Sequence, residues 1–578
     1  MKSLYSLNKY FLKYKWLFIL GVLFVSLSTI FGTYTAVIVR KSTNTVLKFI
    51  TENTFSDTSV FIWYGLTIIG LSLASALFMF LMRQTIIVMS RHIEYDQKNE
   101  LYKHYQALDI TFFKQHATGD LMNRITEDIG KVRMYTGPAV MYMANTVVTV
   151  ITVLAFMLSV NWQLTILVFL PLPFLSFIIY KVSDLINKRS TRVQEELSGL
   201  TSHAQETFSA IRVIKAYAQE KFFSESLTAK GETYKKENLK LARIEAYFQP
   251  TMILMIGLSI MITIWYGGYL VMHKKIEAGN IPEFIMNVYR LTWPFASLGW
   301  VTSLVQRAAA SQERLNEFLN TEPKIKNSAS EIKAIQGDIK FKNVSFTYPE
   351  TGIKALKNIS FHLKKGQTLG ITGPVGSGKS TLVQLLSRFY ENQNGEILID
   401  NISVNDHDLY QLRKSMGVVP QEVFLFSDLI SNNISFAGEK QFSRIEIEQA
   451  AKNASVYENI IHFPKQFETF VGERGITLSG GQKQRVSIAR AIINKPQILI
   501  FDDCLSAVDT ETEAVILNNL KQIMKDKTSI IISPRISGLK HADIIIYLKD
   551  GEILESGSHS ELLNLNGQYF CLNELQKN

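Results

Sequence analysis

Long apolar runs fill the chain up to about residue 305, and they constrain its fold more than any other feature of the sequence. Each run has roughly 20 or more residues, the length that a helix needs to cross a hydrocarbon core of about 30 Å. After about residue 335 the sequence has the pattern of a soluble α/β domain. With 578 residues, the chain is too long for one ordinary domain of roughly 100–200 residues.

Hydropathy predicts six membrane spans in these runs. We place them at about 16–39, 59–83, 136–160, 162–183, 247–272 and 281–305. Polar, helix-prone stretches rich in Lys and Arg follow the second and fourth spans. The positive-inside rule therefore places these stretches, and both termini, in the cytoplasm. The first span imitates a signal peptide, but its apolar run is too long and lacks an evident cleavage site.

Charge and cysteine content limit the possible partners of the chain. The formal net charge is +10. Because Lys and Arg crowd the loops predicted to face the cytoplasm, we attribute this charge to membrane topology and predict no nucleic-acid binding. The two cysteines, Cys504 and Cys571, indicate no disulfide framework and fit a reducing compartment.

A phosphate-binding loop lies in the second half of the chain, where residues 373–380 read GPVGSGKS between a predicted strand and a predicted helix. Glycines let backbone N–H groups close around phosphates, and the helix N-terminus adds positive potential. Lys379 would contact the β- and γ-phosphates, and the Ser380 hydroxyl would bind Mg²⁺. The predicted cofactors are therefore ATP and Mg²⁺. The residues expected to bind them here are Gly373, Gly376, Ser377, Gly378, Lys379, Ser380 and Thr381.

Two further residues are weaker candidates for the same site. Tyr348 lies about 25 residues before the loop and could stack on adenine, although tyrosines in strands are more often packing residues. Gln421 leaves an apolar strand, where its side chain could reach the metal ion or a water molecule.

The order and spacing of these motifs resemble the ATP-binding-cassette domain. The sequence LSGGQ at 478–482, Asp502 after an apolar strand, SAVD at 506–509 and the segment 551–562 complete that pattern. With six spans ahead of it, the whole chain resembles a half-transporter of the exporter class. The resemblance implies six transmembrane helices with long cytoplasmic extensions, followed by an α/β P-loop nucleotide-binding domain with a helical subdomain. We expect these domains at 1–320 and 337–578, joined by a linker at 321–336.

The resemblance also implies roles for single residues. Tyr348 would stack on adenine, while Lys379, Ser380, Gln421 and Asp502 would hold the phosphates and Mg²⁺. Ser479, Gly480, Gly481 and Gln482 would close over a nucleotide bound to a second subunit. Asp509 would lie at the interface between two nucleotide domains. The segment 472–475 would touch the coupling helices, expected at the hairpin tips near 112–120 and 210–217; plain helical hairpins are the alternative for those tips.

Two positions depart from the family pattern. Asp503 stands where the pattern has the Glu that polarises the attacking water, and its side chain is one methylene shorter. A general base contributes roughly 10²–10⁴-fold, and a misplacement on the order of 1 Å can cost about 10²-fold. Pro534 stands where the pattern has a His that contacts the γ-phosphate, and proline offers no hydrogen-bond donor. The predicted catalytic positions are therefore Asp503, Pro534 and Gln421.

Both departures fall in the site built on this chain's own phosphate loop, whereas the signature LSGGQ keeps its pattern. We therefore predict a heterodimer with a second half-transporter, whose phosphate loop, Glu and His would form the hydrolytic site together with Ser479–Gln482 of this chain. A drifted but working site, or a shifted alignment at Pro534, is the alternative.

Arg290, about three turns into the sixth span, bears on the substrate. A charge there is costly in lipid and should face a wet cavity or a partner. There are two interpretations of Arg290: contact with an anionic or amphipathic ligand, or a structural ion pair, for example with the partner chain. The predicted function is ATP-driven export of apolar or amphipathic compounds, drug-like or lipid, across the inner (cytoplasmic) membrane. The alternatives are a regulatory or gating subunit without transport and a slow homodimeric lipid flippase.

Overall fold

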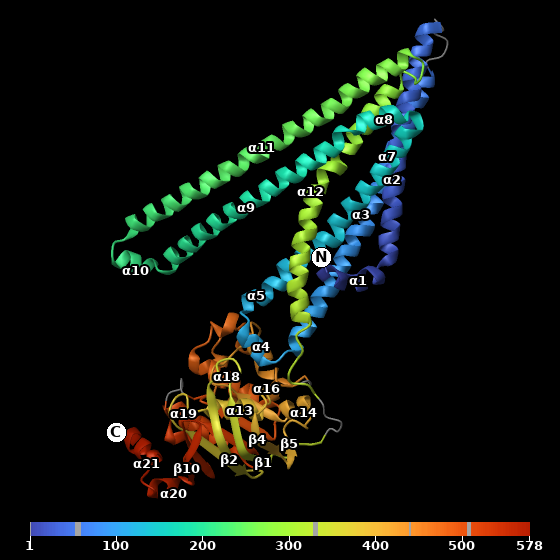
Figure 1. Cartoon of the computed structure of the whole chain (residues 1–578). Helices are drawn as coiled ribbons and strands as arrows, with labels where there is room; N and C mark the ends of the chain where they lie inside the picture. The colour runs from blue at the N-terminus through green and yellow to red at the C-terminus, as the bar shows by residue number, and fades with distance from the viewer. Residues whose placement is uncertain (1, 53–58, 328–332, 439–440, 506–509, 578) are drawn as a thin grey trace. The chain divides into compact units, whose positions relative to one another are not determined.

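The structure is a computed structural model, and the description below applies to all residues except 1, 53–58, 328–332, 439–440, 506–509 and 578 (Figure 1). The chain divides into two compact units. One contains Met1–Gln106 and Thr118–Thr321, and the other contains Ala107–Ala117 and Glu322–Asn578. The domain boundaries predicted at 320 and 337 stay predictions. The SAVD stretch at 506–509, with Asp509, lies outside the described residues.

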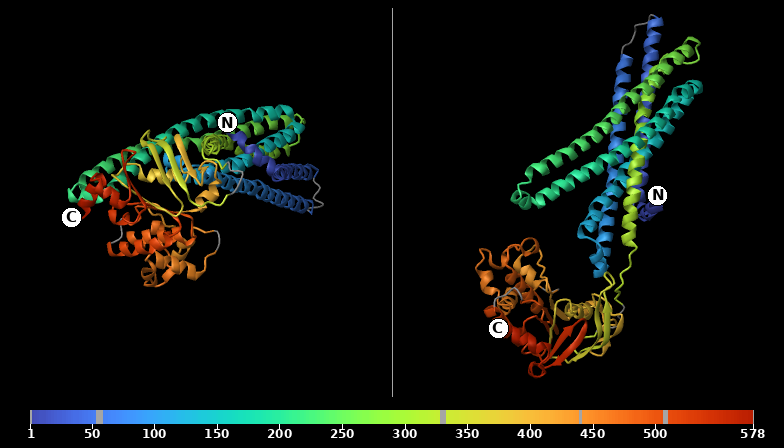
Figure 2. Two further views of the ribbon diagram at one scale, coloured as in Figure 1. Left: turned by 90° about the horizontal axis from the view of Figure 1, so that it is seen from below. Right: turned by 60° about the vertical axis from the view of Figure 1, so that its left-hand side comes forward.

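The first unit is built from long helices. They are α2 (Lys15–Glu52), α3 (Ser59–Ala107), α7 (Val140–Val160), α9 (Pro171–Ser209), α11 (Glu220–Met272) and α12 (Asn280–Leu319). Shorter helices are η1 (Lys2–Leu7), α1 (Asn8–Lys13), α5 (Thr118–Asn123), η2 (Arg124–Asp128), α6 (Ile129–Met134), η3 (Tyr135–Ala139), α8 (Trp162–Phe169) and α10 (Ile211–Ala216). Helices α9 and α11 run side by side and are joined through α10 (Figures 1 and 2).

Asn161 separates two of the predicted spans. Its side chain accepts a hydrogen bond from the N–H of Leu164 at 2.9 Å, which caps α8 directly after the end of α7. An asparagine in this position satisfies one of the free N–H groups at the start of a helix. The chain therefore turns at Asn161, between the predicted spans 136–160 and 162–183.

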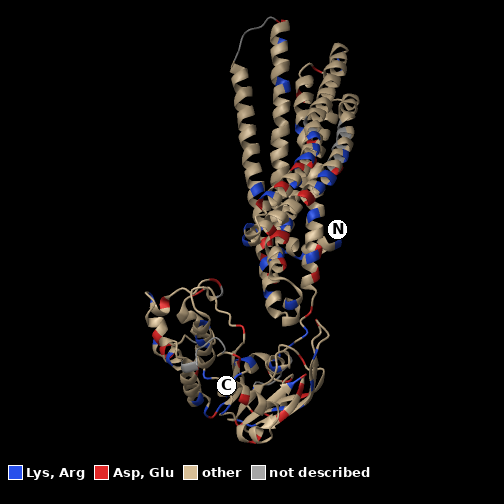
Figure 3. Cartoon of the chain, turned by 90° about the vertical axis from the view of Figure 1, so that its left-hand side faces the viewer, with Lys and Arg blue, Asp and Glu red and all other residues tan. Residues whose placement is uncertain are grey.

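Four helical stretches in the described part of the chain are long and apolar enough to cross a membrane. They are Lys15–Glu52, Ser59–Ala107, Thr118–Val160 and Glu220–Met272. The predicted spans 162–183 and 281–305 also lie in helices, but these helices are not among the four. In α12 the polar side chains of Glu283, Asn287 and Arg290 interrupt the apolar sequence. The number of six spans therefore stays a prediction. Long stretches of the helices carry no charged residue (Figure 3).

The second unit is an α/β domain with two sheets. The antiparallel sheet has the order β2-β1-β4-β5, with β1 (Ile339–Thr347), β2 (Lys354–Leu363), β4 (Asn394–Ile399) and β5 (Ile402–Ser403). The larger sheet has the order β10-β9-β3-β8-β7-β6, with β3 (Thr368–Thr372), β6 (Met416–Val419), β7 (Ile498–Asp502), β8 (Thr528–Ile532), β9 (Ile544–Lys549) and β10 (Glu552–Gly557). Strands β9, β3, β8, β7 and β6 are parallel, and β10 is antiparallel to β9.

Helices pack on these sheets around two apolar cores. The helices are α4 (Ile110–Gln115), α13 (Lys379–Leu386), α14 (Leu409–Lys414), α15 (Ile430–Ser435), α16 (Arg444–Asn453), α17 (Tyr457–Ile461), α18 (Gly480–Ile493), α19 (Thr510–Met524), α20 (His559–Asn564) and α21 (Gln568–Lys577), with short turns η4 (Gln466–Glu468), η5 (Glu473–Gly475) and η6 (Ile536–Gly538). One core joins β1, β2, β3 and α13. The other joins α15 to α18 with β6 and β7, and so contains the predicted helical subdomain.

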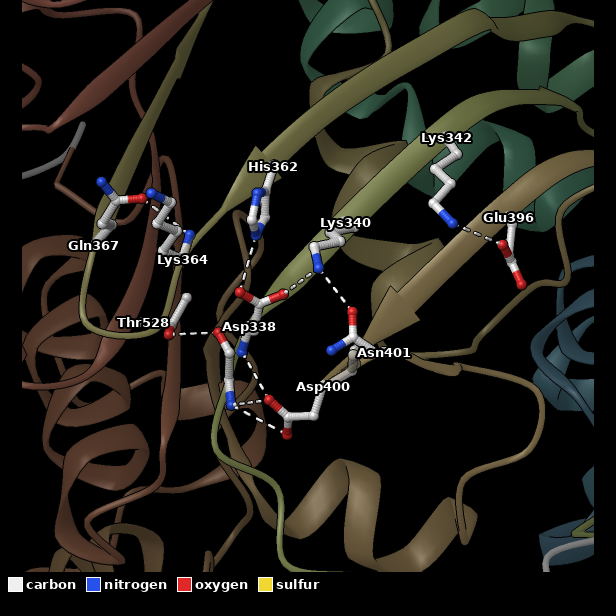
Figure 4. Close-up of polar contacts among 12 residues, drawn as sticks. Asp338, Lys340, Lys342, His362, Lys364, Gln367, Glu396, Asp400, Asn401 and Thr528 are labelled. Atoms are coloured by element: carbon white, nitrogen blue, oxygen red, sulfur yellow. Dashed lines mark hydrogen bonds and ion pairs between the residues drawn. The ribbon is translucent and has the colours of Figure 1, made fainter.

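Asp400, directly after β4, is hydrogen-bonded to the segment that leads into β1 (Figure 4). Its carboxylate accepts hydrogen bonds from the N–H groups of Gln336, Gly337 and Asp338, at 2.6, 3.1 and 2.9 Å. The Thr528 hydroxyl donates to the Gly337 carbonyl at 2.6 Å from the start of β8. Since Thr528 belongs to the larger sheet, these bonds connect the two sheets at the start of β8, at the opposite end of this strand from the site described below.

Candidate nucleotide site

Three neighbouring strands bring the predicted ATP-site residues to one edge of the larger sheet. Strand β8 lies between β3 and β7, and Ile532 is opposite Ile371 on one side and Asp502 on the other. Because the strands are parallel, the chain leaves all three at the same edge. The phosphate loop, Asp503 and Pro534 therefore meet there.

Glycines give the phosphate loop its shape. The φ angles of Gly373, Gly376 and Gly378 are +142°, +80° and +99°, a region that other residues rarely adopt. A Cβ atom at Gly373 would lie 2.0 Å from the Leu548 carbonyl oxygen, and one at Gly378 would lie 2.4 Å from that of Ala355. The loop thus forms a close backbone cradle in front of α13, and this shape fits a phosphate group.

Lys379 reaches back across this cradle. Its Nζ atom donates to the carbonyl oxygens of Gly373 and Pro374, at 2.9 and 2.7 Å. Burial lowers the pKa of the Lys379 ammonium, while the carboxylates of Asp502 and Asp503 act in the opposite direction. The ammonium is therefore held over the loop, at the place where a lysine can contact bound phosphates.

Ser380 and Asp502 form an oxygen-rich pair beside the loop. The Ser380 side chain forms a hydrogen bond with the Asp502 carboxylate, which is buried at the end of β7. Burial raises the pKa of Asp502, although Ser380 and Lys379 lower it. Gln421 is exposed two residues after β6, which pairs in parallel with β7, so it leaves the sheet at the same edge. Hydroxyl, carboxylate and amide oxygens are the donor set that Mg²⁺ prefers.

Tyr348 is held against α13. Its hydroxyl bonds to the hydroxyl of Thr381 at 2.9 Å and donates to Gln384 Oε1 at 3.1 Å. The Tyr390 ring packs edge-on against it, with ring centroids 5.4 Å apart. The Nζ atom of Lys114, on α4, lies 5.0 Å from the centre of the Tyr348 ring. The stacking of Tyr348 on adenine stays a prediction. Lys114 belongs to no motif, and only the predicted contact between the tip near 112–120 and the soluble domain pointed to it.

Asp503 begins the loop after β7. Its backbone φ is +46°, and its N–H donates to the Ile532 carbonyl at 2.9 Å. Burial raises the pKa of the Asp503 carboxyl, and the neighbouring Asp502 raises it further. The environment of this carboxyl group therefore favours the protonated form more than water does, and its role as the base stays a prediction.

The loop after β8, residues 533–536, is held from several sides. The Ser533 hydroxyl accepts the Arg535 N–H at 3.0 Å. The Pro534 carbonyl accepts from Gln576 Nε2 at 2.7 Å, and the Ile536 N–H donates to Gln576 Oε1 at 2.8 Å. The side chain of Arg535 pairs with Glu513, a buried residue of α19. Gln576 and Glu513 belong to no motif, so no signal in the sequence indicated that they hold this loop.

The signature residues form the start of α18. Ser479 caps this helix by accepting the N–H of Gln482 at 3.3 Å, and Gln482 Oε1 accepts the Ser479 N–H at 2.9 Å. Ser479 and Gly480 are exposed. Among the described residues, the signature forms no hydrogen bond with the phosphate loop of its own chain. The positive N-terminal end of α18 is thus open to an anion. Arg290 is not part of this site and lies in the helical unit.

Two family models match the chain. The model described as "ABC transporter transmembrane region" matches residues 17–295, and the model described as "ABC transporter" matches residues 356–506. A solved structure described as "a bacterial Atm1-family ABC exporter with ATP bound" superposes with a TM-score of 0.80. It covers 96% of this chain and 98% of its own, at 24% identity, and so shows the fold alone.

Named relatives match most of this chain and most of their own length. The multidrug resistance-like ATP-binding protein MdlA of Escherichia coli (strain K12) is 35% identical and covers 91% of this chain and 89% of its own. The probable multidrug resistance ABC transporter ATP-binding/permease protein YheI of Bacillus subtilis (strain 168) is 37% identical over 82% and 81%. The ATP-dependent lipid A-core flippase of Photobacterium profundum is 34% identical over 82% and 81%.

The matches to both regions, in this order, agree with a helical membrane unit followed by an ATP-binding domain. The expected coarse fold and the expected ATP-binding class are therefore confirmed. The chain belongs to the ABC transporter family and joins a transmembrane region and an ATP-binding domain in one polypeptide.

Proposed function

We propose that this chain is one half of an ATP-driven exporter of apolar or amphipathic compounds, drug-like or lipid, and that it works with a different second half-transporter. The pair would lie in the cytoplasmic membrane, with six spans from this chain and both termini in the cytoplasm. Relatives named for multidrug resistance and for lipid A-core flipping support this class of cargo.

The observation that carries the asymmetric part of this proposal is the composition of one sheet edge. Lys379, Ser380 and Asp502 would hold the phosphates and a metal ion; their contacts beside the phosphate loop support this. At the same edge, Asp503 has a side chain one methylene shorter than Glu, and Pro534 has no side-chain donor. The site would bind ATP well and hydrolyse it slowly, because misplacing a general base by on the order of 1 Å can cost about 10²-fold.

The second site would lie at the exposed start of α18. Ser479–Gln482 would close over a nucleotide held by the phosphate loop of the partner, which would also supply the Glu and the His. The ATP-binding domains would close on each other when both sites are filled, and α4 and α10 would pass this movement to the helices. Hydrolysis in the second site would then reset the transporter.

Isolation from the native cell tests this proposal. We would tag this chain, extract it in mild detergent, and identify and count the copurifying subunits by mass spectrometry. We expect a second half-transporter with Glu and His at the two positions and an altered signature. Recovery of this chain alone, at two copies per particle, would contradict the heterodimer. Vesicles that contain both chains but show no ATP-dependent flux would instead identify a regulatory subunit.

A further inference from the structure

Arg290 carries a charge near the centre of a predicted span. It is nine residues beyond the start of the span 281–305, which is about 14 Å along an α-helix and close to the middle of a hydrocarbon core of about 30 Å. In the described part of the chain, no carboxylate lies within ion-pair distance of its guanidinium. A charge at this depth needs a counter-charge or water, and it commonly marks a substrate path.

Glu283, the acidic residue of the predicted span 281–305, already forms an ion pair with another residue. The carboxylate of Glu283, two turns before Arg290, accepts hydrogen bonds from Arg40 Nη1 at 3.3 Å and from Asn280 Nδ2 at 3.0 Å. Its side chain is only 2% exposed. Glu283 therefore neutralises Arg40 and is not the counter-charge of Arg290.

Gly32 of α2 makes room for the guanidinium of Arg290. A Cβ atom at this glycine would lie 2.4 Å from Nη1 and 2.5 Å from Nη2. The side chain is thus held against the backbone of α2 rather than free in the membrane. Arginine presents its N–H donors in a planar fork that matches the two oxygens of a carboxylate or phosphate.

Asn287 supplies a second polar group on the same helix face. It precedes Arg290 by three residues, and positions three apart lie on one side of a helix. It is 1% exposed, and its Oδ1 atom has no hydrogen-bond partner among the residues that the structure describes. Buried polar atoms almost always have partners, so this oxygen indicates a missing donor such as a hydroxyl group.

Two exposed aromatic rings continue this helix face. Trp293 follows Arg290 by three residues and Tyr289 by four, so it adjoins both on the helix surface, and both rings are 60% exposed. Tyr142 of α7 packs edge-on against Trp293, with ring centroids 6.4 Å apart. Apolar surface therefore adjoins a group that binds anions, a combination suited to an amphiphile.

We propose that Arg290 and Asn287 bind the headgroup of an anionic amphiphile, with phosphate or carboxylate oxygens on Arg290 and a hydroxyl of the headgroup on Asn287. The apolar part of the ligand lies along Tyr289 and Trp293. This inference rests on the export function proposed above and names its substrate class. An anionic lipid and a soluble organic anion share this chemistry, and the experiment below distinguishes them.

The test compares substrates that differ in charge. The complex isolated through the tagged chain is reconstituted in liposomes, and ATP-dependent movement is measured for three fluorescent probes: phosphatidylglycerol, phosphatidylcholine and carboxyfluorescein. A neutral dye serves as a fourth substrate. We expect movement of phosphatidylglycerol or carboxyfluorescein, and the one that moves shows whether the anion comes from the lipid leaflet or from solution.

Three variants probe the site itself. Arg290→Ala should raise the apparent KM for the anionic probe by at least about tenfold, as expected for a lost charged hydrogen bond, and leave the neutral dye unchanged. Arg290→Lys should raise the apparent KM for the anionic probe by a smaller factor than Arg290→Ala. Gly32→Ala keeps the charge but displaces the guanidinium, so it should show the same selective loss. Arg307→Ala, which removes an exposed charge from the same helix beyond the span, is the control.

Two results would overturn the inference while leaving export intact. One is equal KM values for anionic probes in the wild type and in both Arg290→Ala and Gly32→Ala. The other is a uniform loss of all substrates, or of subunit assembly, in Arg290→Ala, which would identify a structural ion pair. Absence of ATP-dependent movement of every substrate in the wild type would instead overturn the proposed function.

Discussion

Asp502, which is predicted to bind the metal ion, illustrates at the residue scale how a buried carboxylate lowers stability. Its carboxylate is 6% exposed at the end of β7, and burial raises its pKa above the ordinary value of 3.8. A raised pKa in the folded state means that the ionised form is less stable there than in the unfolded chain. The penalty is present at neutral pH and disappears as the pH falls through the raised pKa. A divalent cation would remove the same penalty by supplying positive charge.

We predict that Asp502→Asn stabilises the nucleotide-free protein at neutral pH. The amide has nearly the same shape but no charge to bury. The unfolding midpoint of the ATP-binding domain should rise by about 2–4 °C for each kcal/mol relieved. Scanning fluorimetry without nucleotide measures this, and the gain should shrink as the pH is lowered. An unchanged or lower midpoint at pH 7 would contradict the burial argument. Stabilisation of the wild type by Mg²⁺ and ATP should be weaker in the variant.

At the scale of elements, α21 holds the loop that follows β8. Gln576 bonds on one side to the Pro534 carbonyl and on the other to the Ile536 N–H. Glu513 of α19 holds Arg535 of the same loop. In this way, one helix before the loop and one after it in the chain position this loop at the nucleotide edge of the sheet, although the loop itself has no histidine.

We predict that Gln576→Ala loosens this loop. Loss of the two hydrogen bonds should cost about 1–2 kcal/mol locally, which corresponds to about 5- to 30-fold faster exchange of the amide protons at 535–538. Hydrogen–deuterium exchange with mass spectrometry measures the change. Glu574→Gln is the control, because it removes an exposed ion pair with Lys577 from the same helix without touching the loop. Equal exchange in both variants would show that α21 does not hold the loop.

At the scale of the whole molecule, the two nucleotide motifs of this chain would serve different sites. The phosphate loop lies at the edge of the larger sheet, and the signature is exposed at the start of α18. In an asymmetric pair, the loop of this chain belongs to the slow site and its signature to the fast one. A symmetric pair would depend on both motifs equally.

We predict that Ser479→Ala lowers the ATPase rate of the isolated complex by about 10²-fold, whereas Lys379→Ala lowers it by less than about tenfold. Steady-state phosphate release measures both rates. Because Ser479 also caps α18, the control is Ser443→Ala, which removes the equivalent capping box from α16 at a cost of about 1 kcal/mol. Equal losses of ATPase rate in Ser479→Ala and Lys379→Ala would favour a symmetric dimer and rule out the proposed pair of one slow and one fast ATP site.

The local parts of this protein could be predicted from the sequence. The apolar runs predicted the long helices, and the strands predicted ahead of the phosphate loop and of Asp502 correspond to β3 and β7. These features depend on neighbouring residues, through hydrophobic periodicity and through the glycines of the loop. For the same reason the replacements at Asp503 and Pro534 were visible before the fold was known.

Only the tertiary structure decided which distant side chains meet. Gln576 lies 42 residues from Pro534, and no local pattern indicates their hydrogen bond. The contact between Gly32 and Arg290 joins two helices from opposite ends of the membrane region. Packing also decides the surroundings of the charged residues in α12. Glu283 forms an ion pair with Arg40, whereas Arg290 has no ion-pair partner among the described residues. Sequence determines the chemistry carried by each element, whereas contacts between elements depend on the packing of many side chains at once.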